Sequence, residues 1–327
     1  VPRNAPAVFM LGAKAFSAMF HDGRVAANPD HAKGFDSPAG DDLLEGLDNP
    51  LAAQAMFPVT SGAEMAGQAG ENDVADAADH LPTLWGLLTA RLMDNEEYRA
   101  MFSAAYPDIT VPEDVTFAHA ANAIGAFEAA AWRVDNAPFD NYIRGDKSAM
   151  SKSAVRGMSL FYGQAGCGDC HAGALQTDQG FYATAMPPVG PGKGHGETGH
   201  DDFGRSAVTG DDADRYKFRV TTLRNVAITG PWGHSGAYDT LEAVVSHMIN
   251  PTNSFDHYDR SQLRVISRDD LDALDFIALD DEAVREATKA ASEIIPKTLS
   301  NTQKYDIIAF LRALTDPLFG LGHVQPD

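Results

Sequence analysis

Two cysteines and one histidine stand together in the segment AGCGDCHAG, residues 165–173. Cys167 and Cys170 are the only cysteines of the 327-residue chain, and His171 follows directly. C-x-x-C-H is the attachment signature of c-type haem, in which each thiol forms a thioether and the histidine binds the iron. The spacing suits this chemistry because both sulfurs and the imidazole must reach one macrocycle. The motif therefore predicts one covalent haem c.

Other chemistries could use the same residues. A structural zinc ion takes about four ligands, and no further cysteine is present. A thioredoxin-like pair belongs in a βαβ unit, which this region does not resemble, and a plain disulfide leaves His171 without a role. Haem attachment explains all three side chains. Because haem is attached outside the bacterial cytoplasm, we expect a periplasmic or cell-surface protein.

The residues leave two candidates for the sixth iron ligand. Histidine/methionine ligation raises the iron potential, which suits a haem that receives electrons. Met248 follows Val244 by one helical turn and shares its apolar face. His247, beside it, is the rival ligand.

The charge balance limits the partners. Lys and Arg number 25 against 46 Asp and Glu, a net charge of −21. Nucleic acid is therefore excluded as a partner, because its phosphates need cations. An acidic surface attracts a basic partner such as a small redox carrier, or it serves solubility alone. No apolar run is long enough to span a bilayer.

Helical patterns dominate the chain. Apolar residues recur at helical spacing in segments 84–92 and 117–127. Ser300 and Gln303 form a capping box that predicts a helix start, and Thr240 is placed to cap a further helix. The chain is therefore predicted to be mostly α-helical.

Two segments rich in Gly, Pro, Asp and Asn interrupt this pattern, residues 25–49 and 172–216. Loops this long usually carry function. His195 and His200 lie in the second segment, where they could bind a metal or simply face solvent. A boundary near residues 145–151 divides the chain into two parts of similar size.

Longer stretches resemble one family over almost the whole chain, the bacterial di-haem cytochrome c peroxidases together with MauG. The resemblance implies a mostly α fold of two cytochrome c-like domains with long irregular loops, over residues 1–147 and 148–327. In chain order, the matching segments are RNAPAVF (3–9), HDGRV (21–25), QAMFPVTSGAEM (54–65), FDNYIRGD (139–146), GMSLFYGQAGCGDCH (157–171), FRVTTLRNVAITGPWGHSGAYDTLEAVVSHM (218–248) and LSNTQKYDIIAFLRALTDP (299–317).

The resemblance implies roles for the haem residues. Cys167, Cys170 and His171 would hold the C-terminal haem, where electrons enter in the peroxidases. Met248 falls where the peroxidases place an axial methionine and where MauG places a tyrosine. Methionine there favours the peroxidase-like state.

The resemblance also implies a catalytic pocket in the first domain. Glu64 matches the family's acid/base glutamate, and Gln54 and Pro58 occupy matching pocket positions. A carboxylate is needed there to move a proton between the peroxide oxygens as their bond cleaves.

A calcium site is implied as well. Asn4 would contribute its side-chain oxygen, Thr229 and Pro231 their backbone carbonyls, and water the remaining ligands. Hard oxygen ligands suit calcium.

The sequence departs from the family pattern in three places. The family has two C-x-x-C-H motifs, and this sequence has one. We expect the second haem from a segment upstream of Val1 or from another chain, unless the protein has dispensed with it; the pocket around Glu64 favours a missing segment. His21 replaces a tryptophan between the haems, where it could bind a haem propionate or iron, or be a polar interdomain residue. Trp232 replaces a common tyrosine.

The resemblance implies a periplasmic peroxidase that reduces hydrogen peroxide to water with electrons from a small donor, a cytochrome c or a cupredoxin. The alternative is a MauG-like oxidase that modifies tryptophan or tyrosine of a protein substrate. A second alternative is a single-haem electron-transfer protein without catalysis. A homodimer, or a chain carrying the first haem, is a further possible partner.

Overall fold

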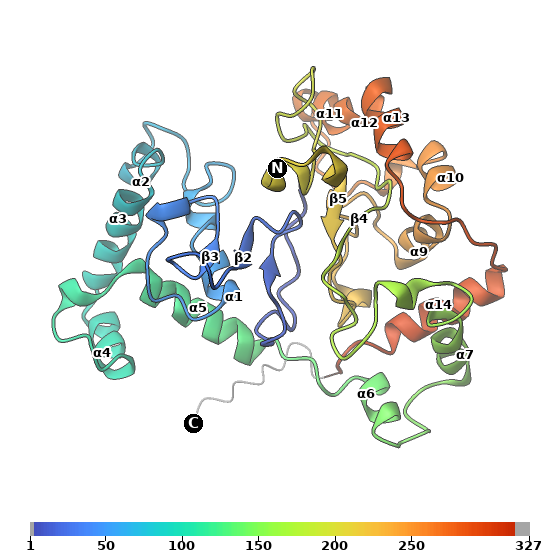
Figure 1. Cartoon of the computed structure of the whole chain (residues 1–327), viewed down its shortest axis with the longest axis horizontal. Helices are drawn as coiled ribbons and strands as arrows, with labels where there is room; N and C mark the ends of the chain where they lie inside the picture. The colour runs from blue at the N-terminus through green and yellow to red at the C-terminus, as the bar shows by residue number, and fades with distance from the viewer. Residues whose placement is uncertain (1–2, 318–327) are drawn as a thin grey trace. The chain divides into compact units, whose positions relative to one another are not determined.

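Residues 3–317 are described by a computed structural model of the chain. Contacts among Cα atoms divide the chain into two compact units, each discontinuous in sequence (Figure 1). Within the described part, unit 1 consists of residues 3–10, 21–23 and 132–317, and unit 2 of residues 11–20 and 24–131. The predicted mostly α fold is confirmed. The division between residues 147 and 148 remains a prediction.

Unit 2 combines a small antiparallel sheet with helices. The sheet has the strand order β1 (Ala18–Met19), β2 (Val25–Ala27) and β3 (Phe35–Asp36). The segment 25–49, predicted as a loop, therefore contains two short strands and is otherwise mostly irregular. The α-helices of unit 2 are α1 (Pro50–Ala55), α2 (Asp73–Asp76), α3 (Leu81–Met93), α4 (Glu96–Ala105) and α5 (Phe117–Ala131).

Helix α5 packs tightly against α1. A Cβ atom at Gly125 would lie 3.1 Å from the backbone nitrogen of Ala52, so glycine permits the close approach. Phe117 is buried, whereas Ile124 and Phe127 are 42% and 55% exposed. The predicted helix is confirmed, but part of its apolar face lies at the surface of the described structure.

Unit 1 holds the C-x-x-C-H segment and a two-stranded sheet of β4 (Phe181–Ala183) and β5 (Lys217–Arg219). None of the helices within residues 3–317 is long and apolar enough to cross a membrane. The α-helices of unit 1 are α6 (Pro138–Ile143), α7 (Lys152–Phe161), α8 (Ser206–Thr209), α9 (Leu241–Ile249), α10 (Pro251–Asp256), α11 (Asp269–Asp275), α12 (Ile277–Asp280), α13 (Glu282–Ala290) and α14 (Asn301–Arg312).

Helices α7 and α14 form the tightest helix pair of unit 1. At Gly157 on α7, an added Cβ would lie 1.8 Å from the carbonyl oxygen of Asp306 on α14. The Asp306 carboxylate accepts hydrogen bonds from Ser153 at 2.5 Å and from Arg156 at 2.7 and 2.8 Å. The backbones of the two helices are therefore in direct contact, and these hydrogen bonds stabilise the contact from the side.

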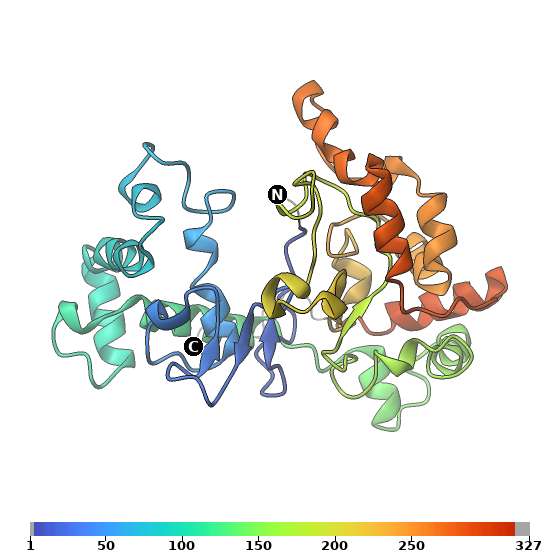
Figure 2. The ribbon, with the colours of Figure 1, turned by 45° about the horizontal axis from the view of Figure 1, so that its top comes forward.

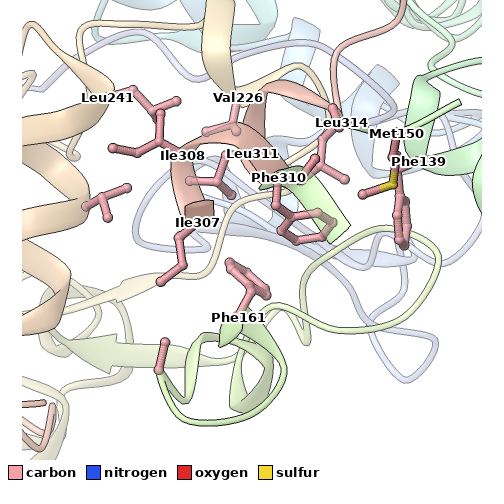
Figure 3. Close-up of a cluster of buried hydrophobic side chains, with 14 of the residues drawn as sticks. Phe139, Met150, Phe161, Val226, Leu241, Ile307, Ile308, Phe310, Leu311 and Leu314 are labelled. Atoms are coloured by element: carbon pink, nitrogen blue, oxygen red, sulfur yellow. The ribbon is translucent and has the colours of Figure 1, made fainter. Parts of the chain in front are cut away.

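The core of unit 1 lies where these helices meet the C-x-x-C-H segment (Figure 3). The rings of Phe161 on α7 and Phe310 on α14 are 5.2 Å apart, and Phe139 of α6 contacts Phe310 at 5.5 Å. Ile307 and Leu314 complete this core and are at most 1% exposed. Cys167 packs against the cluster, so the motif rests on a rigid support.

The predicted helix starts are confirmed. Ser300 and Gln303 form the capping box of α14, and the Thr240 side chain accepts a hydrogen bond from the nitrogen of Ala243 at the start of α9. Helix α10 contacts both α9 and α13, and these three helices lie side by side in the orange part of Figure 2.

The first residues of the chain are tied into unit 1. Arg3 bonds Asp22 at 2.5 Å and both carboxylate oxygens of Asp202 at 2.7 Å. The next residue, Asn4, donates its backbone N–H to the carbonyl of His234 at 2.7 Å. Both bonds to Asp202 come from one guanidinium, a bidentate geometry that is strong and directional.

Candidate haem site

The two cysteines lie on one short turn of unit 1. A 3-10 helix runs over Cys167–Asp169, and Gly166 before it adopts a φ of 70°, which favours glycine. Both thiols are free and partly buried. Burial raises the pKa of Cys167 to about 11. Both thiols are thus unpaired, as attachment of a vinyl group to each requires.

His171 is oriented by the backbone that follows it. Its Nδ1 lies 3.0 Å from the carbonyl oxygen of Gln176, so Nδ1 carries the proton and Nε2 keeps its lone pair. Burial lowers the pKa of His171, which favours the neutral imidazole that binds metals. Fixing the second nitrogen in this way is the usual support of a metal-binding histidine. These residues fit a covalently attached haem whose iron binds Nε2.

The side chain of Gln176 fixes the position of its own backbone carbonyl. Gln176 is 1% exposed and adopts a φ of 53°. Its side chain accepts a hydrogen bond from the Tyr162 hydroxyl at 2.5 Å and donates one to the carbonyl of Gly173 at 2.6 Å. No pattern in the sequence singles out this glutamine, because a residue in a glycine-rich segment gives no periodic signal.

A buried ion pair anchors the same loop to α6. Arg224 and Asp140 are each about 5% exposed and form an ion pair at 2.6 Å. Arg224 also donates to the carbonyl of Ala174 at 2.7 and 3.0 Å, and Thr222 donates to that of Leu175 at 2.7 Å. Breaking such a pair leaves a buried charge uncompensated, so this anchor holds the loop after His171.

The structure separates the two candidates for the sixth ligand. His247 on α9 is fully buried, with Nδ1 2.8 Å from the Tyr238 hydroxyl and Nε2 2.9 Å from the carbonyl of Thr184. Both ring nitrogens are therefore engaged. Met248 packs, partly buried, beside the cluster that contains Met186 and Tyr238. His247 therefore has no free ring nitrogen for an iron, and Met248 as the ligand stays a prediction.

The residues expected around the peroxide pocket lie in unit 2. Gln54 is near the end of α1, Pro58 opens the 3-10 helix Pro58–Thr60, and Glu64 lies in the turn that follows. Gln54 and Pro58 are partly buried, and Glu64 is exposed. All three belong to one short stretch of chain.

His21 lies in unit 1 and contacts the N-terminal segment. Its Nε2 is 3.0 Å from the carbonyl oxygen of Asn4, and burial lowers its pKa to about 4. The imidazole is therefore neutral and donates to Asn4. The expected bond to a haem propionate or iron stays untested.

The expected calcium ligands come close together. The side-chain amide of Asn4 lies 2.8 Å from the carbonyl oxygen of Pro231, and Thr229 precedes it by two residues. In this structure the Asn4 amide nitrogen donates to that carbonyl, and the calcium site stays a prediction. No cluster of three or more His, Cys, Asp or Glu side chains able to hold a metal occurs between residues 3 and 317.

The loop histidines His195 and His200 support local structure. His195 Nδ1 accepts the backbone N–H of Phe203 at 3.0 Å and its ring stacks on Phe203 at 5.0 Å. His200 Nδ1 lies 3.3 Å from the carbonyl of Pro191.

Known proteins similar to this chain include cytochrome c peroxidases and MauG proteins. The family described as di-haem cytochrome c peroxidase matches residues 1–148. Cytochrome-c peroxidase IdrP2 of Pseudomonas sp. strain SCT is 27% identical over 260 residues, 74% of this chain and 59% of that protein. MauG of Methylorubrum extorquens is 30% identical over 205 residues, 63% of this chain and 50% of that protein. The cytochrome c peroxidase Ccp of Escherichia coli K12 is 27% identical over 268 residues, 76% of this chain and 55% of that protein.

The chain thus spans about half the length of the curated relatives it matches. Among solved structures, a MauG-like protein associated with microbial copper homeostasis has a similar fold, with a TM-score of 0.63 and 24% identity. The match covers 100% of this chain and 78% of that protein. The chain belongs to the di-haem cytochrome c peroxidase and MauG family.

Proposed function

We propose that the protein is a c-type cytochrome peroxidase that reduces hydrogen peroxide to water. A small redox carrier would deliver the electrons to a haem held by Cys167, Cys170, His171 and Met248. When bound, this haem supplies an iron that takes up and passes on single electrons. The proposal rests on one observation above all: two free thiols and a histidine with only Nε2 available lie on one loop.

The residues of unit 1 would set the properties of that haem. Gln176 holds the proton on Nδ1 of His171, which keeps Nε2 directed at the iron. A methionine ligand would raise the iron potential, as suits an acceptor of electrons. Both ring nitrogens of His247 are occupied, which supports Met248 over His247 as the ligand. A methionine at position 248, where the resemblance places a tyrosine in MauG, supports the peroxidase-like ligand set.

Glu64 would act beside a second haem, at which peroxide binds. We propose that its carboxylate takes a proton from one peroxide oxygen and returns it to the other. Gln54 and Pro58 would shape the same pocket. Glu64 and its neighbour Met65, which is 67% exposed, offer a face of unit 2 that a haem could cover.

Haem stoichiometry and turnover test this function. The complete protein assembly should contain two haems for each chain, measured by pyridine haemochrome absorbance against protein mass. It should also oxidise a reduced small cytochrome or cupredoxin steadily when peroxide is added. A single haem would reject catalysis and leave an electron-transfer protein. Two haems with no turnover and a long-lived oxidised spectrum would point to a MauG-like oxidase.

Replacing Glu64 by glutamine should slow peroxide cleavage by about 100-fold or more, the usual scale of acid–base catalysis. Glutamine keeps the size of the side chain but cannot carry the proton. Rapid-mixing absorbance with peroxide measures the step, and haem content should equal that of the parent protein. Glu71→Gln, a change of an exposed glutamate on the same stretch of unit 2, is the matched control. Unchanged cleavage in Glu64→Gln would remove its assigned role.

Replacing Met248 by alanine should abolish the far-red charge-transfer band of sulfur-ligated ferric haem and lower the reduction potential. The reason is that a thioether favours ferrous iron. Met186→Ala, which alters the neighbouring methionine, is the control that should keep the band. A band that persists in Met248→Ala would exclude Met248 as ligand.

Two further proposals accompany this function. Asn4, Thr229 and Pro231 would bind calcium through oxygen atoms, and titration of chelator-treated protein with Ca²⁺ would measure the affinity. Because haem attachment takes place outside the bacterial cytoplasm, we place the protein in the periplasm or at the cell surface, where cell fractionation would detect it.

A further inference from the structure

A tyrosine contacts one of the two haem-attachment cysteines. The hydroxyl of Tyr182 on β4 donates a hydrogen bond to Oδ2 of Asp178 at 2.8 Å. The side chains of Tyr182 and Cys170 are also within hydrogen-bonding reach of each other. Asp178 is linked to the same cysteine, because its backbone nitrogen donates to the carbonyl of Cys170 at 2.8 Å. The phenol, the carboxylate and the attachment sulfur therefore form one cluster.

The local backbone is shaped for this pairing. The backbone nitrogen of Gly180 donates to Oδ1 of Asp178 at 2.8 Å, which leaves Oδ2 to the tyrosine. A Cβ at Gly180 would lie 2.8 Å from the Tyr182 ring and 3.1 Å from the carboxylate. Any larger residue would push the pair apart. Pairing of β4 with β5, in which Tyr182 opposes Phe218, fixes the backbone that carries the ring.

The surroundings favour loss of an electron from the ring. The Asp178 carboxylate acts on the phenol directly, because it accepts the hydrogen bond of the Tyr182 hydroxyl. Negative charge near the phenol stabilises the electron-deficient state. The hydrogen bond to Asp178 raises the pKa of Tyr182 to about 12, so the phenol keeps its proton until the electron leaves. Tyr182 is only partly buried and Asp178 is exposed, so both can be reached from solvent.

We propose that Tyr182 is a redox-active residue that carries electrons between the protein surface and the haem attached at Cys170. In the step, Tyr182 would give one electron to the haem attached at Cys170 after the second haem, oxidised by hydrogen peroxide, has drawn an electron from it, and the O–H proton of Tyr182 moves to Oδ2 of Asp178. The phenolic O–H bond breaks, a carboxyl O–H bond forms, and the haem is reduced by one electron. An external reductant then returns an electron to the phenoxyl radical, and Asp178 returns the proton. This role rests on the proposed function, which supplies the oxidant.

The test is electron paramagnetic resonance of the haem-loaded protein, frozen after oxidation by two routes. One sample receives hydrogen peroxide, and the other a flash-generated ruthenium(III) tris-bipyridine oxidant without peroxide. We expect a tyrosyl signal that narrows when the protein is made with ring-deuterated tyrosine. Tyr182→Phe should lose it. Tyr305→Phe, a change of a tyrosine on α14 that is 63% exposed, should keep it.

A second variant separates proton transfer from packing. In Asp178→Asn the amide can accept the hydrogen bond but cannot take the proton, so the radical yield should fall and recover when imidazole is added as a base. An undiminished signal in Tyr182→Phe, or no tyrosyl signal by either route, overturns the proposal. A signal by the photochemical route alone upholds Tyr182 and instead rejects peroxide as the oxidant of the proposed function.

Discussion

With Cys167 and Cys170 both replaced by alanine, this chain is expected to carry no covalently bound haem. The chain has no other cysteine, so no sulfur remains for a thioether. His171 would still be held by Gln176, but a lone axial bond lets haem dissociate under denaturing conditions. Peroxidase-based haem staining after denaturing electrophoresis, together with pyridine haemochrome absorbance, measures the loss.

Two single-residue variants test whether the loss of covalent haem comes from the missing thioethers. Cys170→Ala keeps one possible thioether, through Cys167, and should retain part of the covalent haem. Met248→Ala keeps both cysteines and should stain like the parent chain. An undiminished content of covalent haem in the double alanine variant would show that the C-x-x-C-H segment is not an attachment site. The double variant should also unfold at lower temperature, because it loses a tightly bound ligand of the folded state.

Gly157→Ala should destabilise unit 1 by more than about 3 kcal/mol, at or beyond the upper end of the usual overpacking cost. The new Cβ would lie 1.8 Å from the Asp306 carbonyl oxygen and 2.9 Å from the nitrogen of Ile307. Both atoms belong to the backbone of α14, which cannot rotate away as a side chain can. The helices must separate, and the contact of Phe161 with Phe310 opens with them.

Gly86→Ala is the matched control for that change. Gly86 also lies inside a helix, α3, but a Cβ there meets no atom within 4 Å. Alanine should therefore leave the protein unchanged or stabilise it by about 1 kcal/mol, the intrinsic preference of helices for alanine over glycine. Thermal unfolding followed by circular dichroism compares the two variants. Equal stability of both would mean that α7 and α14 do not touch backbone to backbone.

Local signals in the sequence predicted much of the helical structure. The capping box at Ser300 and the cap at Thr240 were read correctly because capping depends on residues within one turn. The short strands β2 and β3 were not predicted, since two or three residues show no alternation. Ile124 and Phe127 matched the helical period but lie exposed, because periodicity does not tell which part of a face is covered.

The candidate site was predicted only in part. The C-x-x-C-H spacing identified Cys167, Cys170 and His171, because adjacent residues share one turn. The supports of that turn, such as the ion pair of Arg224 with Asp140, join residues 84 positions apart. No single-sequence pattern marks such a pair. Gln176 and the contact of Tyr182 with Cys170 likewise depend on how a glycine-rich loop folds back, which spacing does not encode.

The attachment of Arg3 to unit 1 limits how the haem-bearing half can be excised. Its partners Asp22 and Asp202 come from opposite halves of the sequence, and the Arg3 guanidinium holds the pKa of Asp202 at about 2 although burial alone would raise it. A cloning boundary placed at residue 148 would leave Asp202 inside without its cation. A recombinant fragment that starts at residue 148 would therefore contain a buried carboxylate, Asp202, without its cationic partner. A minimal haem-carrying protein needs the N-terminal segment with Arg3 as well.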